Sequence, residues 1–141
     1  RSAAKSLWRA RSRRRPPAEP PCPCGSGAPL VACCGRFLEG KADAPDAERL
    51  MRSRYSAFVG ERGDYLLATW HASRRPPAID FDTGAKWLGL EVRRHQSTGP
   101  DSAEVEFVAR WRVGGRAVRL HERSRFVREG GRWYYVDGDQ F

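Results

Sequence analysis

All four cysteines of the chain lie within thirteen residues: Cys22 and Cys24 flank one residue, and the adjacent Cys33 and Cys34 follow after eight more. Disulfides are disfavoured, because adjacent cysteines cannot readily bridge each other and the sequence shows no apolar secretory segment that would lead to an oxidising compartment. Four thiolates around one Zn²⁺ would instead fold a segment too short to have its own core. The clustering therefore favours zinc, although both pairs are closer than the common spacing of two to four residues.

The length of the chain and the distribution of its charge limit the class of protein it can be. The 141 residues are about the size of one domain, and no apolar run approaches the roughly 20 residues of a membrane-spanning helix. The net charge is +9, but residues 1–19 hold seven cations and one acid, which leaves only +3 for the rest. We expect residues 1–20 to form a basic, Arg-rich disordered leader. Nucleic-acid binding would then be non-specific and confined to this leader. We expect the protein to be cytoplasmic.

The first half of the remaining chain has the pattern of helices. Asp46 is a candidate N-cap, and Gly60 is a candidate stop. Between them, apolar residues recur on one helical face: Leu50, Met51, Tyr55, Phe58 and Val59. A second short helix is predicted from about Asp64 to His71.

From Trp87 onward the apolar period changes to two, which is typical of strands. The pairs Gly114–Gly115 and Gly130–Gly131 have the composition of two-residue hairpin turns. Leu88, Leu90 and Val92 are predicted to share one face of the first strand. The whole pattern predicts an α+β domain in which helices pack on a curved antiparallel sheet.

The cysteine segment begins Cys-Pro-Cys-Gly-Ser-Gly and ends at Cys33 and Cys34. It resembles the SEC-C motif, the zinc knuckle known from the end of the translocase motor SecA. Further along, segments 33–40, 50–59, 65–71, 87–92, 106–110 and 120–126 resemble the YchJ-like family of small bacterial proteins. The resemblance implies a SEC-C knuckle at 21–38, followed at 39–141 by a cone of the nuclear-transport-factor-like, or cystatin-like, class. It also implies that Cys22, Cys24, Cys33 and Cys34 are the Zn²⁺ ligands.

The resemblance supplies a fold and a metal but no activity. We expect the backbone N–H groups of Gly25, Ser26 and Gly27 and the side chain of Arg36 to offset the charge of the thiolates. SecA's motif has basic residues and a tyrosine between its cysteine pairs, where this chain has Ala28, Pro29 and Leu30. We therefore do not carry binding of the chaperone SecB over to this chain.

The hairpin turns predict which residues face each other across the strands. Counting from Gly114–Gly115 places Phe107 opposite Glu122 and Val105 opposite Ser124. Counting from Gly130–Gly131 places Phe126 opposite Tyr135, Ser124 opposite Asp137 and Glu122 opposite Asp139. Carboxylates are thus predicted on the face where neighbouring residues predict a core. The other face pairs Glu106 with Arg123 and Glu104 with Arg125, as a solvated surface does.

Two functions are compatible with these carboxylates. They would be structural if they bonded backbone amides or an arginine of the first helix, such as Arg52 or Arg54. They would be functional if the cone held a ligand, and the predicted wall would then consist of Trp70, His71, Trp87, Glu91, Glu122, Ser124 and Asp137. We favour a non-catalytic adaptor that docks partner proteins through the SEC-C motif. The alternative is a small-molecule-binding protein or an acid–base enzyme that uses the cone.

Overall fold

The computed structural model describes residues 19–141. A 3₁₀ turn η1 (Leu30–Ala32) and helix α2 (Cys34–Leu38) precede helix α3 (Ala47–Val59) and helix α4 (Gly63–Ala68). Four strands follow: β1 (Lys86–Gly99), β2 (Ser102–Val113), β3 (Arg116–Glu129) and β4 (Arg132–Gln140). The predicted disordered leader, with its predicted nucleic-acid binding, lies outside the described residues except for its last two positions. No helix within 19–141 is long and apolar enough to span a membrane.

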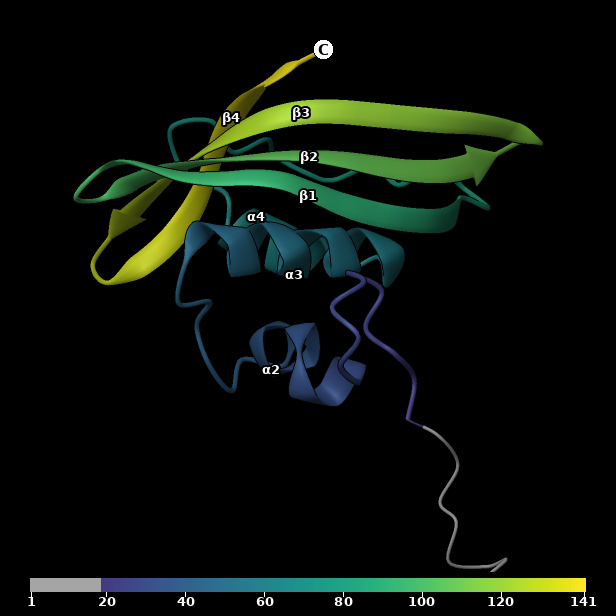
Figure 1. Ribbon diagram of the computed structural model, residues 1–141, viewed down its shortest axis with the longest axis horizontal. Coiled ribbons are helices and arrows are strands. Elements are labelled where there is room, and N and C mark those ends of the chain that lie inside the picture. Colours follow the sequence, from purple (N-terminus) through teal and green to yellow (C-terminus); the bar gives the residue numbers. More distant parts are fainter. Residues whose placement is uncertain (1–18) are drawn as a thin grey trace, which may run out of the picture.

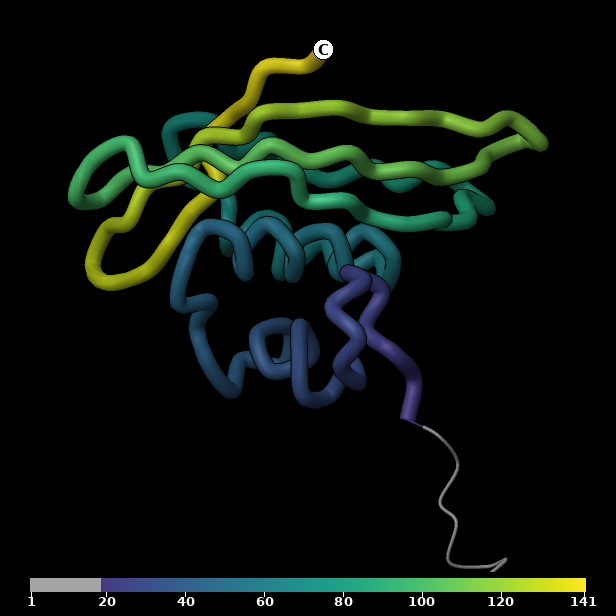
Figure 2. The backbone as a smooth tube through the Cα atoms, viewed as in Figure 1, coloured from purple at the N-terminus to yellow at the C-terminus, as the bar shows by residue number. Residues whose placement is uncertain are grey.

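The molecule is built in layers around α3. The curved sheet covers one side of this helix, and α2 with the cysteine segment lies on the other side (Figure 1). The tube view shows the same arrangement, with the chain passing from the cysteine segment through α3 and α4 before it enters the sheet (Figure 2). The predicted α+β class, a helical layer on a curved antiparallel sheet, is confirmed.

Helix α3 begins and ends where the sequence predicts. The Asp46 carboxylate accepts a hydrogen bond of 2.8 Å from the backbone N–H of Arg49, and Gly60 ends the helix. Helix α4 is shorter than predicted and ends at Ala68 instead of His71. The chain leaves the helix at Thr69 because the backbone there pairs with β4: Tyr135 N–H donates to the Thr69 carbonyl, and His71 N–H donates to the Tyr135 carbonyl.

The sheet is an antiparallel meander in the order β1-β2-β3-β4. Gly114 and Gly115 have φ of 58° and 76°, as the predicted primed turn requires. The predicted β2–β3 register is confirmed, with Phe107 opposite Glu122 and Val105 opposite Ser124. Glu122 and Ser124 therefore lie on the concave face, and both side chains are buried.

The predicted β3–β4 register is correct only next to the turn. Phe126 faces Tyr135, but the register then shifts by one residue, so Ser124 faces Gly138 and Glu122 faces Gln140. A one-residue shift sends every later side chain to the opposite face. The prediction that Asp137 and Asp139 share the inner face with Glu122 is therefore wrong.

On the outer face, Arg125 binds Asp137 through Nε at 2.6 Å and Asp139 through Nη1 at 2.8 Å. Glu106 lies opposite Arg123 as predicted, but its carboxylate instead contacts the His121 ring at 2.7 Å. The charges of this face satisfy one another, as expected of a solvated sheet surface.

A second irregularity changes the inner face of β1. The β1–β2 register shifts between Trp87 and Gly89, which turns Leu88 outward and leaves 47% of it exposed. Trp87, Leu90 and Val92 pack against the core. The prediction that Leu88 shares a face with Leu90 is wrong for this reason.

Candidate metal centre and ligand cavity

The four cysteine side chains converge on one point. Their sulfur atoms all lie within 4.8 Å of one another, and those of Cys24 and Cys33 are 3.7 Å apart. A tetrahedral metal with metal–sulfur bonds of about 2.3 Å requires sulfur–sulfur distances of about 3.8 Å. All four cysteines are free thiols. The geometry and the donor set therefore fit one four-coordinate metal ion.

The chain between the cysteine pairs is folded by its own backbone hydrogen bonds. Cys22 N–H donates to the Ala28 carbonyl at 2.9 Å, and Gly25 N–H donates to the Cys22 carbonyl at 3.2 Å. Leu30 N–H closes the loop by donating to the Pro20 carbonyl at 2.9 Å. Turn η1 then leads directly into α2, whose first residue is Cys34. The two cysteine pairs thus come from a tight loop and a helix start that face each other.

Hydrogen bonds to the sulfur atoms favour a thiolate at Cys24. The pKa of Cys24 is lowered to about 4, first because Cys34 donates a hydrogen bond to its sulfur and then because Ser26 donates from both its hydroxyl and its backbone. The same hydrogen bond raises the pKa of the donor Cys34, and burial raises that of Cys33. The Ser26 hydroxyl also lies 3.1 Å from the Cys33 sulfur. Ser26 therefore has the backbone role predicted for it and adds its hydroxyl, whereas Gly25 N–H donates to the Cys22 carbonyl instead of a sulfur atom. Arg36 points elsewhere: its Nε donates to the Cys33 carbonyl, and its guanidinium lies over the Phe37 ring.

The metal centre is attached to helix α3. The Cys22 sulfur lies 3.6 Å from the hydroxyl of Ser56, which is 2% exposed. Arg52 Nη1 donates to the Cys24 carbonyl at 2.9 Å, while its Nε binds Glu48. Leu90 of β1 packs against both the cysteine cluster and the main core. The knuckle is therefore a layer of the fold, not a separate appendage.

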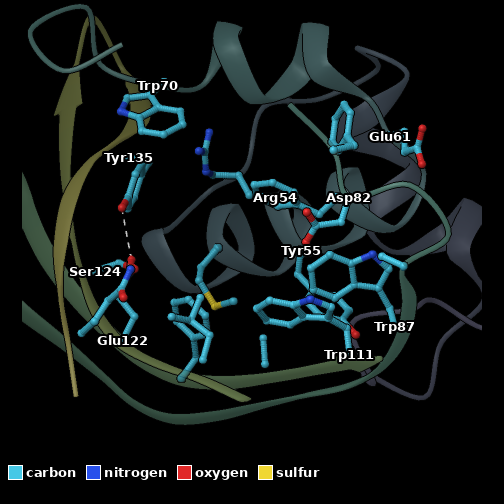
Figure 3. A pocket seen from close by; sticks show the side chains of 18 of the residues that line it. Arg54, Tyr55, Glu61, Trp70, Asp82, Trp87, Trp111, Glu122, Ser124 and Tyr135 are labelled. Carbon is cyan, nitrogen blue, oxygen red and sulfur yellow. Dashed lines mark hydrogen bonds between the residues drawn. The ribbon is translucent and has the colours of Figure 1, made fainter. Parts of the chain in front are cut away.

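A cavity of about 380 Å³ lies between α3, the concave face of the sheet and the loop that precedes β1 (Figure 3). Most of its wall is apolar. Nine aromatic side chains line it: Tyr55, Phe58, Trp70, Phe81, Trp87, Phe107, Trp111, Phe126 and Tyr135. The Trp87 and Trp111 rings lie 4.9 Å apart between centroids at a tilt of 37°, and Tyr55 meets Trp87 edge-on.

Two buried charged side chains stand at one end of this cavity. Arg54 and Glu122 are 6% and 8% exposed, and they are the only charged residues in the buried set of 19–141. Arg54 Nη1 donates to the Leu66 carbonyl at 2.8 Å and to the Thr69 hydroxyl at 2.7 Å. Burial lowers the pKa of Arg54 to about 10.

Glu122 is held by hydroxyl groups. Its Oε2 accepts from the Ser124 hydroxyl at 2.5 Å and from the Tyr135 hydroxyl at 3.1 Å. Burial, followed by the nearby Glu122 charge, raises the pKa of Tyr135, which keeps its hydroxyl protonated as a donor. A Cβ at position 138 would lie 2.5 Å from Glu122 Oε2, so Gly138 leaves the space that the carboxylate occupies.

Comparison with known proteins identifies the family. Residues 46–138 match the family described as YchJ, middle NTF2-like domain. The chain belongs to the YchJ-like family. The "UPF0225 protein" of Polaromonas naphthalenivorans is 63% identical over 133 residues, covering 86% of this chain and 98% of the relative. A "UPF0225 protein" of Xanthomonas campestris is 58% identical over 120 residues, covering 83% of this chain and 92% of the relative.

Two solved structures share the fold of this YchJ-like protein. A solution structure of a SEC-C motif containing protein from Rhodopseudomonas palustris aligns with a TM-score of 0.75 at 37% identity, covering 85% of this chain and 98% of the other. A crystal structure of a SEC-C motif containing protein from Psychrobacter arcticus aligns with a TM-score of 0.70 at 28% identity, covering 82% and 80%. The NTF2-like cone and the SEC-C motif with its cysteine cluster are thereby established for this chain.

The YchJ-like cone brings together some of the predicted wall residues and not others. Trp70, Trp87, Glu122 and Ser124 line the cavity. His71, Glu91 and Asp137 lie outside it. The His71 ring contacts Ser73 and Glu129, each at 2.7 Å, while Glu91 binds Arg93 and Asp137 binds Arg125 on the surface. His71 is displaced because α4 ends early, and Asp137 because the β3–β4 register shifts.

The predicted wall omits most of the cavity residues, among them Arg54 and Tyr135 at the charged end. A signal for Arg54 exists in the sequence, because residues 51, 54, 55 and 58 follow the i, i+3, i+4, i+7 spacing of one helical face. A charged residue in an apolar helical stripe indicates a buried charge that needs a partner. Tyr135 lies on the inner face opposite Phe126, as predicted, but no sequence signal shows that its hydroxyl reaches Glu122.

The fit between Gly138 and Glu122 gives a testable prediction. Gly138→Ala places a methyl group against the Glu122 carboxylate, so we expect the free energy of unfolding to fall by about 1–3 kcal/mol in urea titrations. Gly60→Ala is the control, since its Cβ would meet Ser56 O at an ordinary 3.5 Å and the change should cost less than about 1 kcal/mol. Equal stability of the two variants would show that Glu122 does not occupy the observed position.

Proposed function

We propose that this YchJ-like protein binds a small molecule in its cone and holds one structural Zn²⁺ in its four-cysteine centre. The observation that carries the proposal is the cavity of about 380 Å³, which has an aromatic wall and a charged inner end. Sites for small molecules are concave and mostly apolar, with a few placed polar groups that fix the orientation of the ligand. A purely structural cone would instead fill this space with side chains at core density.

The donor set supports zinc as the metal. Four thiolates in a tetrahedral arrangement suit Zn²⁺, and a site closed by four protein ligands leaves no coordination position for a substrate. Zn²⁺ bound there would neutralise part of the thiolate charge and hold the loop of residues 22–34 against α3. Ser26 and Ser56 would remain hydrogen-bonded to the sulfur atoms and would orient them.

Ligand binding is a better supported function than catalysis. The other cavity carboxylates, Glu61, Asp80 and Asp82, are exposed, so a buried general acid or base would have to be Glu122. Its Oε2 is already bonded to two hydroxyl groups. Binding requires only the cavity and its polar end. The enzyme alternative therefore rests on one buried carboxylate, whereas the binding proposal rests on the whole wall.

Docking of a partner protein through the SEC-C segment is a second candidate function. The observation that favours it is Val31 in turn η1, which is 62% exposed beside the metal centre. An exposed aliphatic side chain on a rigid turn is a suitable contact for another protein, although a single such residue is common on protein surfaces. This role and the ligand role use different faces and do not exclude each other.

The metal proposal predicts one zinc per chain. Protein purified without added zinc should contain about one equivalent by elemental analysis, and Cys24→Ser should lose most of it because three ligands bind zinc far more weakly than four. Ala32→Ser, an exposed change in the same segment, should keep full occupancy. Metal-free protein with a mapped disulfide among the four cysteines would contradict the proposal.

The cavity proposal predicts that enlarging two alanines of β2 will have different effects on stability. Ala109 lines the cavity and Ala103 does not, although both are buried. Ala109→Phe should therefore change the free energy of unfolding by less than about 1 kcal/mol, while Ala103→Phe should lower it by about 1–3 kcal/mol through overpacking.

Ligand binding can be tested with the same pair of variants. In a fragment screen by protein NMR, aromatic fragments should shift the resonances of cavity residues in the wild type, and Ala109→Phe should abolish these shifts. If no fragment shifts cavity residues, or if the shifts survive in Ala109→Phe, the proposed function is wrong.

A further inference from the structure

The Arg54 guanidinium lacks a direct counter-charge. Arg54 takes part in none of the ion pairs within 4 Å that residues 19–141 form. The residue is nevertheless only 6% exposed. Burying a cation without an adjacent anion is costly. Burial lowers the pKa of Arg54 to about 10 because the charged guanidinium is desolvated.

One edge of the guanidinium is also free. Both hydrogen bonds of Arg54 to described residues use Nη1, which leaves Nε and Nη2 without a partner. Every fully buried side-chain nitrogen and oxygen in this part of the chain has a hydrogen-bond partner. Because Nε and Nη2 of Arg54 have none, they are not fully buried and must touch solvent. Arg54 lines the cavity, so solvent in the cavity lies next to its side chain. Nε–H and Nη2–H form the fork that binds a carboxylate through two parallel hydrogen bonds.

Aromatic rings hold the fork in place. The guanidinium carbon lies 4.7 Å from the centroid of the Tyr135 ring and 5.0 Å from that of Trp70. Figure 3 shows the Arg54 head group at the Trp70 and Tyr135 end of the cavity, with Glu122 and Ser124 on the same side. Together with the bonds from Nη1 to Leu66 and Thr69, these rings fix the fork before any ligand arrives.

We propose that the ligand of this cavity is an aromatic monocarboxylate whose carboxylate binds the Nε–Nη2 edge of Arg54. The inference rests on the proposed ligand-binding function and names the chemical class of the ligand. The ring system of the ligand packs against the aromatic wall that includes Trp87 and Trp111. A cavity of about 380 Å³ has room for a molecule of about two fused rings.

The remaining charges of the cavity select against ligands with several negative charges. Glu122 stands at the same end as Arg54, and the exposed carboxylates of Glu61, Asp80 and Asp82 line the rest of the cavity. One cation therefore faces four acids. The repulsion by these acids grows with the charge of the ligand, so a nucleotide or other polyanion is repelled more strongly than a single carboxylate, for which two hydrogen bonds to Arg54 can offset it.

The test begins with the wild-type protein and three probes that share one ring system. 2-Naphthoate carries one negative charge, 2-naphthamide is its neutral isostere, and 2-naphthyl phosphate carries close to two negative charges at neutral pH. We expect naphthoate to bind at least tenfold more tightly than either of the other two in NMR titrations, because a charge-assisted bidentate contact contributes more than a neutral one. Naphthoate should also shift the Nε–H resonance of Arg54.

Variants on helix α3 assign the effect to one residue. Arg54→Gln should reduce naphthoate binding at least tenfold and leave naphthamide binding within about threefold. Arg49→Gln is the matched control, because Arg49 lies on the same helix, is exposed and does not line the cavity. If Arg54→Gln does not fold, Arg54→Lys keeps the charge but removes the fork, and the difference between naphthoate and naphthamide should shrink.

The outcomes separate this inference from the proposed function. If naphthoate and naphthamide bind the cavity equally well, or if the phosphate binds best, the ligand class is wrong while the binding function stands. If all three probes leave the cavity resonances unchanged at millimolar concentration and the fragment screen also fails, both are wrong. An unshifted Arg54 Nε–H signal at saturating naphthoate likewise overturns the assignment to Arg54.

Discussion

Helix α3 is packed on both sides, and the two candidate sites depend on its position. On one side, Ser56 and Arg52 contact the cysteine loop through a sulfur atom and a carbonyl. On the other side, Met51, Arg54 and Tyr55 line the cavity under the sheet. An isolated helix of thirteen residues is only marginally stable in water, so this helix depends on what covers it. The metal centre is one of the two layers that cover it.

The inner end of the cone is maintained by charges that an ordinary core would not contain. Glu122 needs the hydroxyls of Ser124 and Tyr135 and the space left by Gly138, and Arg54 needs the carbonyl of Leu66. Replacing such groups with packed apolar side chains is often neutral or stabilising. Their presence beside an open cavity is what a binding site requires, because a ligand can then satisfy the group that the protein leaves free.

The sequence predicted the elements and one register well, because each depends on local rules. The cap at Asp46, the stop at Gly60 and the β2–β3 register follow from capping and turn geometry. The β3–β4 register failed beyond Phe126 because nothing in the composition marks the shift there. That single residue moved Asp137 to the outer face, where it binds Arg125, and placed Gly138 opposite Ser124.

The cysteine cluster was predictable because its residues are close in sequence, and the SEC-C resemblance added the ligand set. The cavity was predictable only in part, because its wall is drawn from α3, from connecting segments and from all four strands. Arg54 could have been found from its place in the apolar stripe of residues 51–58. Its free edge could not, because that depends on where Leu66 and Thr69 place their oxygen atoms.

Hydrogen exchange on the metal-loaded and chelated protein tests most directly whether the metal centre supports α3. Chelation should reduce the protection of amides in residues 20–38 and also in Ala47–Val59, while amides of β2 and β3 keep most of theirs. Returning Zn²⁺ should restore both segments. If chelation loosens residues 20–38 and leaves the protection of α3 unchanged, the knuckle is an independent appendage and α3 does not depend on the metal centre.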